Sequence, residues 1–262
     1  MNGETVQLIN QLERRISKIE SQIVRPDRLV QAWMAMHSMV SMIPGLRGVW
    51  FMNQSQAGTI YDASSQARHM SINGTIVFSQ PTEFFRYAVF DGSSTYLNRT
   101  SEAGLEIPNA LSVMSWFYKE TAATQFPMLA KTNGFAANTN TSFYFIHGTS
   151  DNLNLSITSG TTTYSGTMLA PVGEWVYGGG NYRPNTAINL YMGTQDGWGS
   201  DSNTTGIPAS INTAASTDLT IGATHGGANF ADGNIGFSLI ANANLDEIVF
   251  RTFFEHTKAL FF

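Results

Sequence analysis

From Gly48 onward, apolar and polar residues alternate in short runs, and this pattern restricts the possible folds more than any other feature of the chain. Residues 152–158 alternate strictly, with Leu or Ile at every second position, and residues 188–192 repeat the pattern. Residues 113–118 and 142–147 are bulkier runs typical of strands. Successive residues of a strand point to opposite faces, so the runs predict half-buried strands. The Gly, Asn and Pro turns between them indicate an antiparallel sandwich.

The first 45 residues follow a different period. Apolar residues recur there at spacings of three and four, namely Ile9, Leu12, Ile16, Ile19 and Ile23. Isoleucine at heptad position a, with leucine or isoleucine at d, favours trimers or tetramers over dimers. Arg15 at g and Glu20 at e are spaced to pair between neighbouring chains. We therefore expect a homo-oligomer, with the trimer preferred. The alternative is one amphipathic helix lying on its own β domain, because three heptads only just suffice for a coiled coil.

A second helix is expected over residues 27–43, after Pro26 and before Pro44-Gly45. It carries a stripe of methionines, Met34, Met36, Met39 and Met42. Methionines at helical spacing pack against a β domain or a sister chain, or else form an adaptable docking surface. The predicted domains are a helical oligomerisation and anchoring segment, 1–45, and a β domain, 46–262.

Charge and cysteine content exclude several classes of function. Only 13% of the residues are charged, the net charge is −5 and no basic cluster occurs, so nucleic acid is not an expected partner. There is no cysteine, which excludes disulfides, thiolate catalysis and Cys-ligated zinc. No apolar run is long enough for a membrane span. Charges at Glu4, Glu13, Arg14 and Arg15 interrupt any signal peptide, so we expect synthesis in a host cytoplasm.

Six short motifs follow one another between residues 46 and 255. They are Gly48-Val49-Trp50-Phe51 with Tyr61-Asp62-Ala63-Ser64; residues 87–92 with Tyr96-Leu97; residues 111–117, including Trp116; Gly173-Glu174-Trp175 with residues 189–193; Leu219-Thr220-Ile221-Gly222; and residues 245–250. In this order they resemble a laminin-G-like domain of the concanavalin A-like jelly-roll (lectin and glucanase) superfamily.

The resemblance implies a mainly β fold, a concanavalin A-like antiparallel jelly-roll sandwich, preceded here by the α-helical coiled-coil segment. It also implies a closing strand at residues 245–250. The chain departs from the pattern in the long loop 194–216 and in a final helix that runs into Phe261-Phe262. We expect the apolar end of the chain, Phe253-Phe254 and Leu260-Phe261-Phe262, to be buried or to form an interface. Because the family includes adhesion modules, lectins, toxins and viral surface proteins, the fold alone does not fix a function.

No motif predicts catalysis. Retaining glycosidases need two carboxylates about 5 Å apart, whereas Asp246 and Glu247 are adjacent and would point to opposite faces of a strand. The histidines are scattered, and no nucleophile elbow, phosphate loop or dinucleotide motif occurs. We interpret the glycines at 178–180 and 226–227 as turns with positive φ. The sequence thus predicts no enzyme, no catalytic residue and no cofactor.

A weaker feature is an aromatic residue among small polar ones. Trp198 is flanked by Asp196, Asp201 and Asn203, which is the chemistry of a carbohydrate subsite: a ring face for the sugar and oxygens for its hydroxyls. The alternative is a hairpin loop whose tryptophan folds back on the sheet or meets a neighbouring subunit. The same oxygens match no calcium loop, since calcium takes six to eight ligands, and no metal is predicted.

Together, the oligomerising helix, the jelly roll and the missing secretion signal resemble phage virion proteins, and we expect a virion structural protein. It would decorate a capsid or belong to a tail, contact other virion proteins and display its jelly rolls outward. The alternative is a carbohydrate-binding or receptor-binding lectin-like adhesin whose partner is a host-surface glycan and whose platform is Trp198. A glycanase is the third and least supported hypothesis.

Overall fold

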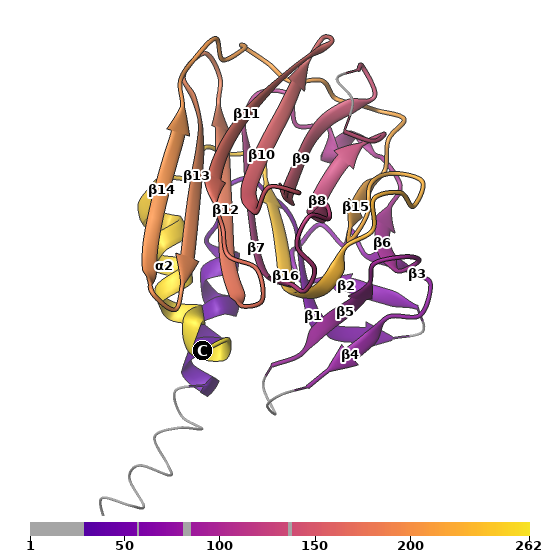
Figure 1. Ribbon diagram of the computed structural model, residues 1–262, viewed down its shortest axis with the longest axis vertical. Helices are drawn as coiled ribbons and strands as arrows, with labels where there is room; N and C mark the ends of the chain where they lie inside the picture. Colours follow the sequence, from indigo (N-terminus) through magenta and orange to yellow (C-terminus); the bar gives the residue numbers. More distant parts are fainter. Residues whose placement is uncertain (1–28, 57, 81–84, 136–137) are drawn as a thin grey trace, which may run out of the picture.

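The fold was analysed in a computed structural model, which describes residues 29–56, 58–80, 85–135 and 138–262 (Figure 1). A helix covers residues 29–41, as the sequence predicts. The predicted coiled-coil positions Ile9, Leu12, Arg15, Ile16, Ile19, Glu20 and Ile23 lie outside the described residues. The coiled coil therefore stays a prediction.

Antiparallel strands are the main secondary structure of the described chain. In the first part they are β1 (Leu46–Gln56), β2 (Thr59–Asp62), β3 (Met70–Asn73), β4 (Val77–Ser79), β5 (Tyr87–Asp91), β6 (Tyr96–Arg99), β7 (Leu111–Lys119) and β8 (Phe126–Thr132). In the second part they are β9 (Thr141–His147), β10 (Asn152–Ser159), β11 (Thr162–Leu169), β12 (Trp175–Arg183), β13 (Ala187–Thr194), β14 (Gly197–Asn203), β15 (Leu219–Ile221) and β16 (Asp232–Ala241). The helical elements are η1 (Ala103–Leu105), α2 (Glu247–Thr257) and η2 (Lys258–Leu260).

The strands form one sheet that folds over on itself into a nearly closed sandwich. Its order is β11-β10-β9-β8-β15-β6-β3-β2-β1-β16-β7-β12-β13-β14, with β5 on β16 and β4 on β5. The two ends of this order meet, because the Asn203 side chain of β14 donates a hydrogen bond to the Ser165 carbonyl oxygen of β11, at 2.8 Å. The predicted strands 113–118, 142–147, 152–158 and 188–192 are confirmed as parts of β7, β9, β10 and β13.

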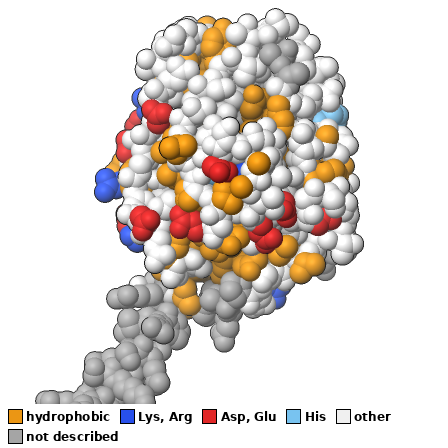
Figure 2. Space-filling view, in the orientation of Figure 1, with side chains coloured by type: hydrophobic (Ala, Val, Ile, Leu, Met, Phe, Trp, Pro, Cys, Tyr) orange, Lys and Arg blue, Asp and Glu red, His pale blue; other side chains and the backbone are white. Residues whose placement is uncertain are grey.

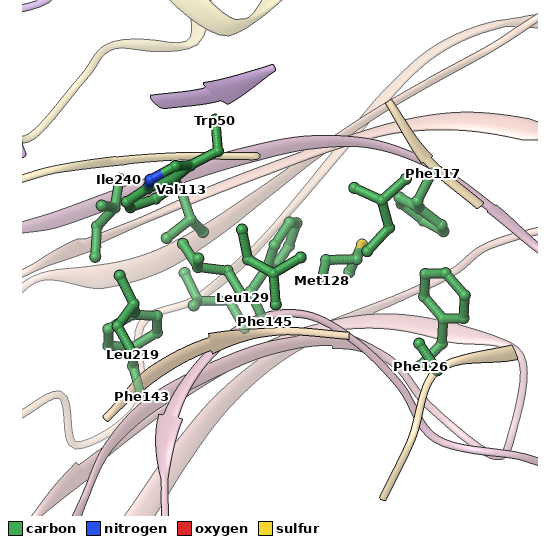
Figure 3. Packing of buried hydrophobic residues seen from close by; sticks show 14 of the residues in the cluster. Trp50, Val113, Phe117, Phe126, Met128, Leu129, Phe143, Phe145, Leu219 and Ile240 are labelled. Carbon is green, nitrogen blue, oxygen red and sulfur yellow. The ribbon is translucent and has the colours of Figure 1, made fainter. Parts of the chain in front are cut away.

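The sandwich core lies between the two halves of the sheet and is aliphatic and phenyl-rich. Trp50, Val113 and Ile240 project from one half toward Phe143 and Phe145 in the other, all without exposed surface (Figure 3). The Trp50 indole also donates a hydrogen bond to the Arg68 carbonyl oxygen at 2.8 Å. Close packing between the two halves leaves these side chains enclosed.

A helix layer covers the other face of strands β1, β16, β7, β12 and β13. Here α2 and the helix at residues 29–41 pack against the sheet, side by side behind β12–β14 in Figure 1. β7 shows the consequence: Val113 and Phe117 enter the sandwich core, whereas Met114 and Trp116 pack under the helices. In a strand that is buried on both faces, the sequence is continuously apolar and does not alternate between apolar and polar residues.

The predicted closing strand at residues 245–250 is wrong. Residues 247–250 form the first turn of α2, and the last strand is β16, which no motif in the sequence predicts. The buried side chains of α2 are Phe250, Phe253, Phe254 and Thr257, at the spacing of one helix face. The expected burial of the apolar end is confirmed for Phe253, Phe254 and Leu260, whereas Phe262 remains 47% exposed.

The interpretation of residues 178–180 as a turn is also wrong. These glycines lie within β12, and none of them has a positive φ. A Cβ atom at Gly179 would lie 2.5 Å from the Phe250 ring, and one at Gly193 would lie 2.3 Å from the Phe254 ring. Glycine at these positions therefore lets the α2 phenylalanines approach the sheet. At residues 226–227 the turn prediction is confirmed, with φ of +77° and +70°.

Candidate binding site beside Trp198

The predicted loop 194–216 contains a strand. Gln195 and Asp196 form the turn between β13 and β14, and Trp198 lies on β14 opposite Gly193. Gly193 has no side chain, and the Phe254 ring occupies the space beside it. The turn residues are exposed and Trp198 is half-buried.

The predicted subsite residues do not share one face. Trp198 points toward the helix layer, where its Nε1 atom donates a hydrogen bond to the Glu247 carboxylate at 3.0 Å. Asp201 and Asn203 lie an odd number of positions away, on the opposite face of β14. The Asn203 side chain is engaged there by the Ser165 carbonyl oxygen on β11. The structure thus brings Trp198 to a different set of side chains from the one the sequence predicts.

Aromatic neighbours hold the Trp198 ring in place. Its centroid lies 5.6 Å from that of Phe254, 6.0 Å from that of Tyr177 and 6.2 Å from that of Tyr191. These contacts and the hydrogen bond to Glu247 fix the ring before any ligand arrives. A fixed ring loses little conformational entropy on binding.

A hollow of about 500 Å³ opens beside this ring, between the β13–β14 hairpin and the end of the chain. We call it the Trp198 hollow. It is lined by Thr194, Gln195, Gly197, Trp198, Arg251, Phe254, Glu255, Lys258, Ala259 and Phe262. Binding sites for small ligands combine such apolar walls with a few polar groups that set orientation. Here the polar groups are a hydroxyl, an amide, a guanidinium, an ammonium and a carboxylate.

Most charged groups at the hollow already have partners. The Lys258 ammonium lies 2.6 Å from the Glu255 carboxylate and 5.5 Å from the centre of the Phe254 ring. Glu247 accepts the hydrogen bond from Trp198. Among the described residues, Arg251 is exposed and has no ion pair or side-chain hydrogen bond. It is therefore the cation of the hollow that a ligand can engage.

Sequence reasoning found Trp198 but missed Arg251, Phe254, Glu255 and Lys258. These residues belong to α2 and to η2, just after the segment 245–250 that was predicted as the closing strand. The signal was present, since Arg251 and Glu255 are four residues apart and Phe250 and Phe254 repeat that spacing. The four-residue spacing identifies a helix, but it does not show that this helix packs beside the β13–β14 hairpin.

A second concave surface lies between the helix at residues 29–41 and α2. This apolar groove has a volume of about 220 Å³ and is lined by Met39, Met42, Ile43, Pro44, Ile248, Val249, Thr252 and Phe253. Met42 and Ile248 at its rim are 70% and 67% exposed, and Met34 nearby along the helix is 64% exposed. Met36 is buried against the sheet, so the methionine stripe is divided between core and surface.

The acidic motifs of the sequence are structural. Asp62 accepts hydrogen bonds from the backbone N–H groups of Val49, Ser64 and Arg68, all at 2.9 Å, which tie the β2 end to β1. Asp91 accepts them from the turn 93–95. Burial acts to raise the pKa of Asp91, but hydrogen bonds led by those from Ser94 hold it well below its usual range.

The described residues contain no grouping suited to catalysis by a metal. No set of three His, Asp or Glu side chains is close enough to hold an ion within the described part of the chain. Asp246, adjacent to Glu247, instead accepts a hydrogen bond from the Arg183 guanidinium at 2.5 Å. In the same residues, no helix combines the length and apolarity that crossing a bilayer requires.

Comparison with known proteins shows similarity at the level of the fold. No family model matches the sequence, and no curated protein matches it. Among solved structures, the binding domain of botulinum neurotoxin serotype G matches with a TM-score of 0.60 and 8% identity. The match covers 80% of this chain and 51% of that one, so the chain spans about half the length of that neighbour.

Two further neighbours have names that state a carbohydrate ligand. Domain 4 of AbnA, an extracellular arabinanase of Geobacillus stearothermophilus solved with arabinotriose, matches with a TM-score of 0.59 and 18% identity, over 79% of this chain and 97% of that one. Botulinum neurotoxin type C, which depends on two ganglioside molecules to enter cells, matches with a TM-score of 0.54 and 11% identity. The match covers 80% of this chain and 51% of that one. These neighbours are β-sandwich domains that bind carbohydrates or receptors.

Proposed function

We propose that this protein is a lectin-like adhesin module that binds carbohydrate in the Trp198 hollow. The observation that carries the proposal is a half-buried indole held by Tyr177, Tyr191 and Phe254 at the edge of a hollow with polar side chains. An aromatic ring offers its face to the C–H groups of a sugar. The amide of Gln195 and the charged groups around it offer hydrogen bonds to the hydroxyls.

The surface of the protein supports this function. Neutral polar side chains and backbone dominate the face shown in Figure 2, and only 13% of all residues are charged. Such a surface has little long-range attraction for nucleic acid or for charged proteins. The fold neighbours with carbohydrate or receptor ligands point in the same direction, although their low identity extends only to the fold.

A glycan array with the full-length protein tests the proposal. We expect a signal for a limited set of glycans, which Trp198→Ala abolishes because the ring face is lost. Trp175→Ala is the matched control, since Trp175 is also half-buried but does not line the hollow. A blank array, or a signal that survives Trp198→Ala and not Trp175→Ala, contradicts the assignment.

A second candidate function is a virion structural protein that displays these modules as a homo-oligomer. The observation that favours it is the apolar groove with Met42 and Ile248 at its rim, beside the helix that follows the predicted coiled coil. The occupant we assign to the groove is a second copy of the chain. Copies joined through residues 9–23 would bring their helices at residues 29–41 together, and with them their grooves.

Light scattering of the full-length protein tests this candidate. We expect a trimer mass that falls in the double variant Met42→Glu/Ile248→Glu, because two carboxylates would have to be buried. The double variant Ile16→Ala/Ile19→Ala should also dissociate it. A monomeric full-length protein contradicts the candidate and leaves the adhesin as a single module.

A further inference from the structure

Arg251 lies on the exposed side of α2, one helical turn from two glutamates. Glu247 precedes it by four residues and Glu255 follows it by four, spacings at which helical side chains of opposite charge normally pair. Both carboxylates have other partners, however: Glu247 accepts from the Trp198 indole and Glu255 accepts from Lys258. Arg251 is thus left with its guanidinium directed to solvent at the hollow.

The chemistry of a guanidinium selects a particular ligand group. Its planar fork of N–H donors matches the two oxygens of a carboxylate, and it stays charged at any physiological pH. Lys258 is less available for the same role, because the Glu255 carboxylate and the Phe254 ring already hold its ammonium. An anion in the hollow would therefore meet Arg251 as its principal partner.

We propose, as a deepening of the proposed carbohydrate function, that the Trp198 hollow selects sugars bearing a carboxylate and that Arg251 binds that carboxylate. The sugar ring lies on the indole of Trp198, and its acidic group is turned toward α2. Sialic and uronic acids share this chemistry. Neutral sugars bind at the same ring without the ionic contact.

Calorimetric titration with matched glycans tests the inference. The full-length protein is titrated with sialyllactose and with lactose, and separately with digalacturonic acid and with digalactose. We expect the acidic member of at least one pair to bind about tenfold more tightly, the scale of one charge-assisted hydrogen bond. The preference should weaken as salt is added, because the contact lies at an exposed site.

Three variants separate the inference from the proposed function. Arg251→Gln should remove the preference for the acidic sugar by weakening acidic binding much more than neutral binding, and Arg251→Lys should restore only part of the preference. Arg86→Gln is the matched control, since Arg86 is an exposed arginine away from the hollow. Equal binding of acidic and neutral sugars, or a preference that survives Arg251→Gln, overturns the inference alone. Failure of every sugar to bind overturns the proposed function with it.

Discussion

The two faces of β7 pack against layers of different character. On one face Val113 and Phe117 meet the opposite half of the sandwich and are enclosed. On the other face Met114 and Trp116 lie under helices that leave a hollow and a groove at their edges. The same strand therefore supports a closed core and an open, aromatic layer. The comparison teaches that the sandwich core is enclosed, whereas the concave surfaces suited to ligands lie at the edges of the helix layer.

The largest expected effect belongs to the sandwich core. Phe145 has no exposed surface and packs between the two halves of the sheet, so Phe145→Ala should lower the free energy of unfolding by about 3–5 kcal/mol. Denaturant titration measures this loss. The Trp198 side chain is only half-buried. If Trp198→Ala lowered the free energy of unfolding by the same amount, the two layers would not differ as we describe.

A smaller loss is expected where the helix layer meets the sheet. A Cβ atom at Gly193 would lie 2.3 Å from the buried ring of Phe254, so Gly193→Ala should cost about 1–3 kcal/mol and displace α2. Gly199→Ala on the neighbouring strand is the control, because its Cβ atom would meet only Met168 at 3.4 Å. Equal stability of the two variants would show that α2 does not depend on close contact with the sheet.

Acid should weaken one end of the sandwich core. His147 is fully buried, and its Nδ1 atom lies 3.1 Å from the Lys119 ammonium, which also donates to the Gly148 carbonyl oxygen at 2.8 Å. Burial, and then the charge of Lys119, lower the pKa of His147 from 6.5. The folded state therefore holds a neutral imidazole while the unfolded chain takes up a proton.

The sign of the pH effect follows from this difference. The contribution of His147 is complete above pH 6.5 and is lost as the pH falls from there through the lowered folded pKa. Thermal unfolding between pH 7 and pH 5 should show a falling melting temperature. His147→Gln keeps a donor and an acceptor without a titrating group, and should flatten this dependence. An unchanged slope in that variant contradicts the assignment to His147.

The smallest expected effect is a gain in the free energy of unfolding, at Tyr177. The Tyr177 hydroxyl is buried in the helix layer and has no hydrogen-bond partner among the described residues. Burial raises the pKa of Tyr177 well above its ordinary value. Tyr177→Phe removes an unsatisfied polar group and should raise the free energy of unfolding by about 1 kcal/mol. A destabilised variant would mean that the hydroxyl has a partner in solution.

Sequence patterns predicted strands well where one face of the strand differs from the other. β10 alternates because Leu153, Leu155 and Ile157 enter the core, while its other face carries short polar side chains. β16 carries no such alternation, since it is buried on both faces and contains Gly233 and Gly236. Periodicity alone does not distinguish such a strand from other apolar segments.

The errors at α2 and at the site have a common cause. Residues 245–250 resemble the closing strand of a laminin-G-like domain, and only the longer spacing from Phe250 to Thr257 identifies a helix. In the same way, Asp201 and Asn203 were predicted at the site because they are near Trp198 in the sequence, whereas the α2 side chains that line the hollow are far from it in the sequence. The residues of the Trp198 hollow come from β13, β14, α2 and η2, and only the packing of the helix on the sheet brings them together.

Fluorine NMR of the protein labelled with 5-fluorotryptophan tests the central claim most directly. The chain contains five tryptophans, so each can be assigned by single replacement with phenylalanine. On titration with sialyllactose and with lactose, we predict that the Trp198 resonance moves, while that of Trp50, enclosed in the sandwich core, does not. A Trp198 resonance that stays fixed with both sugars, whether or not another moves, would contradict the assignment of the binding site to the helix layer.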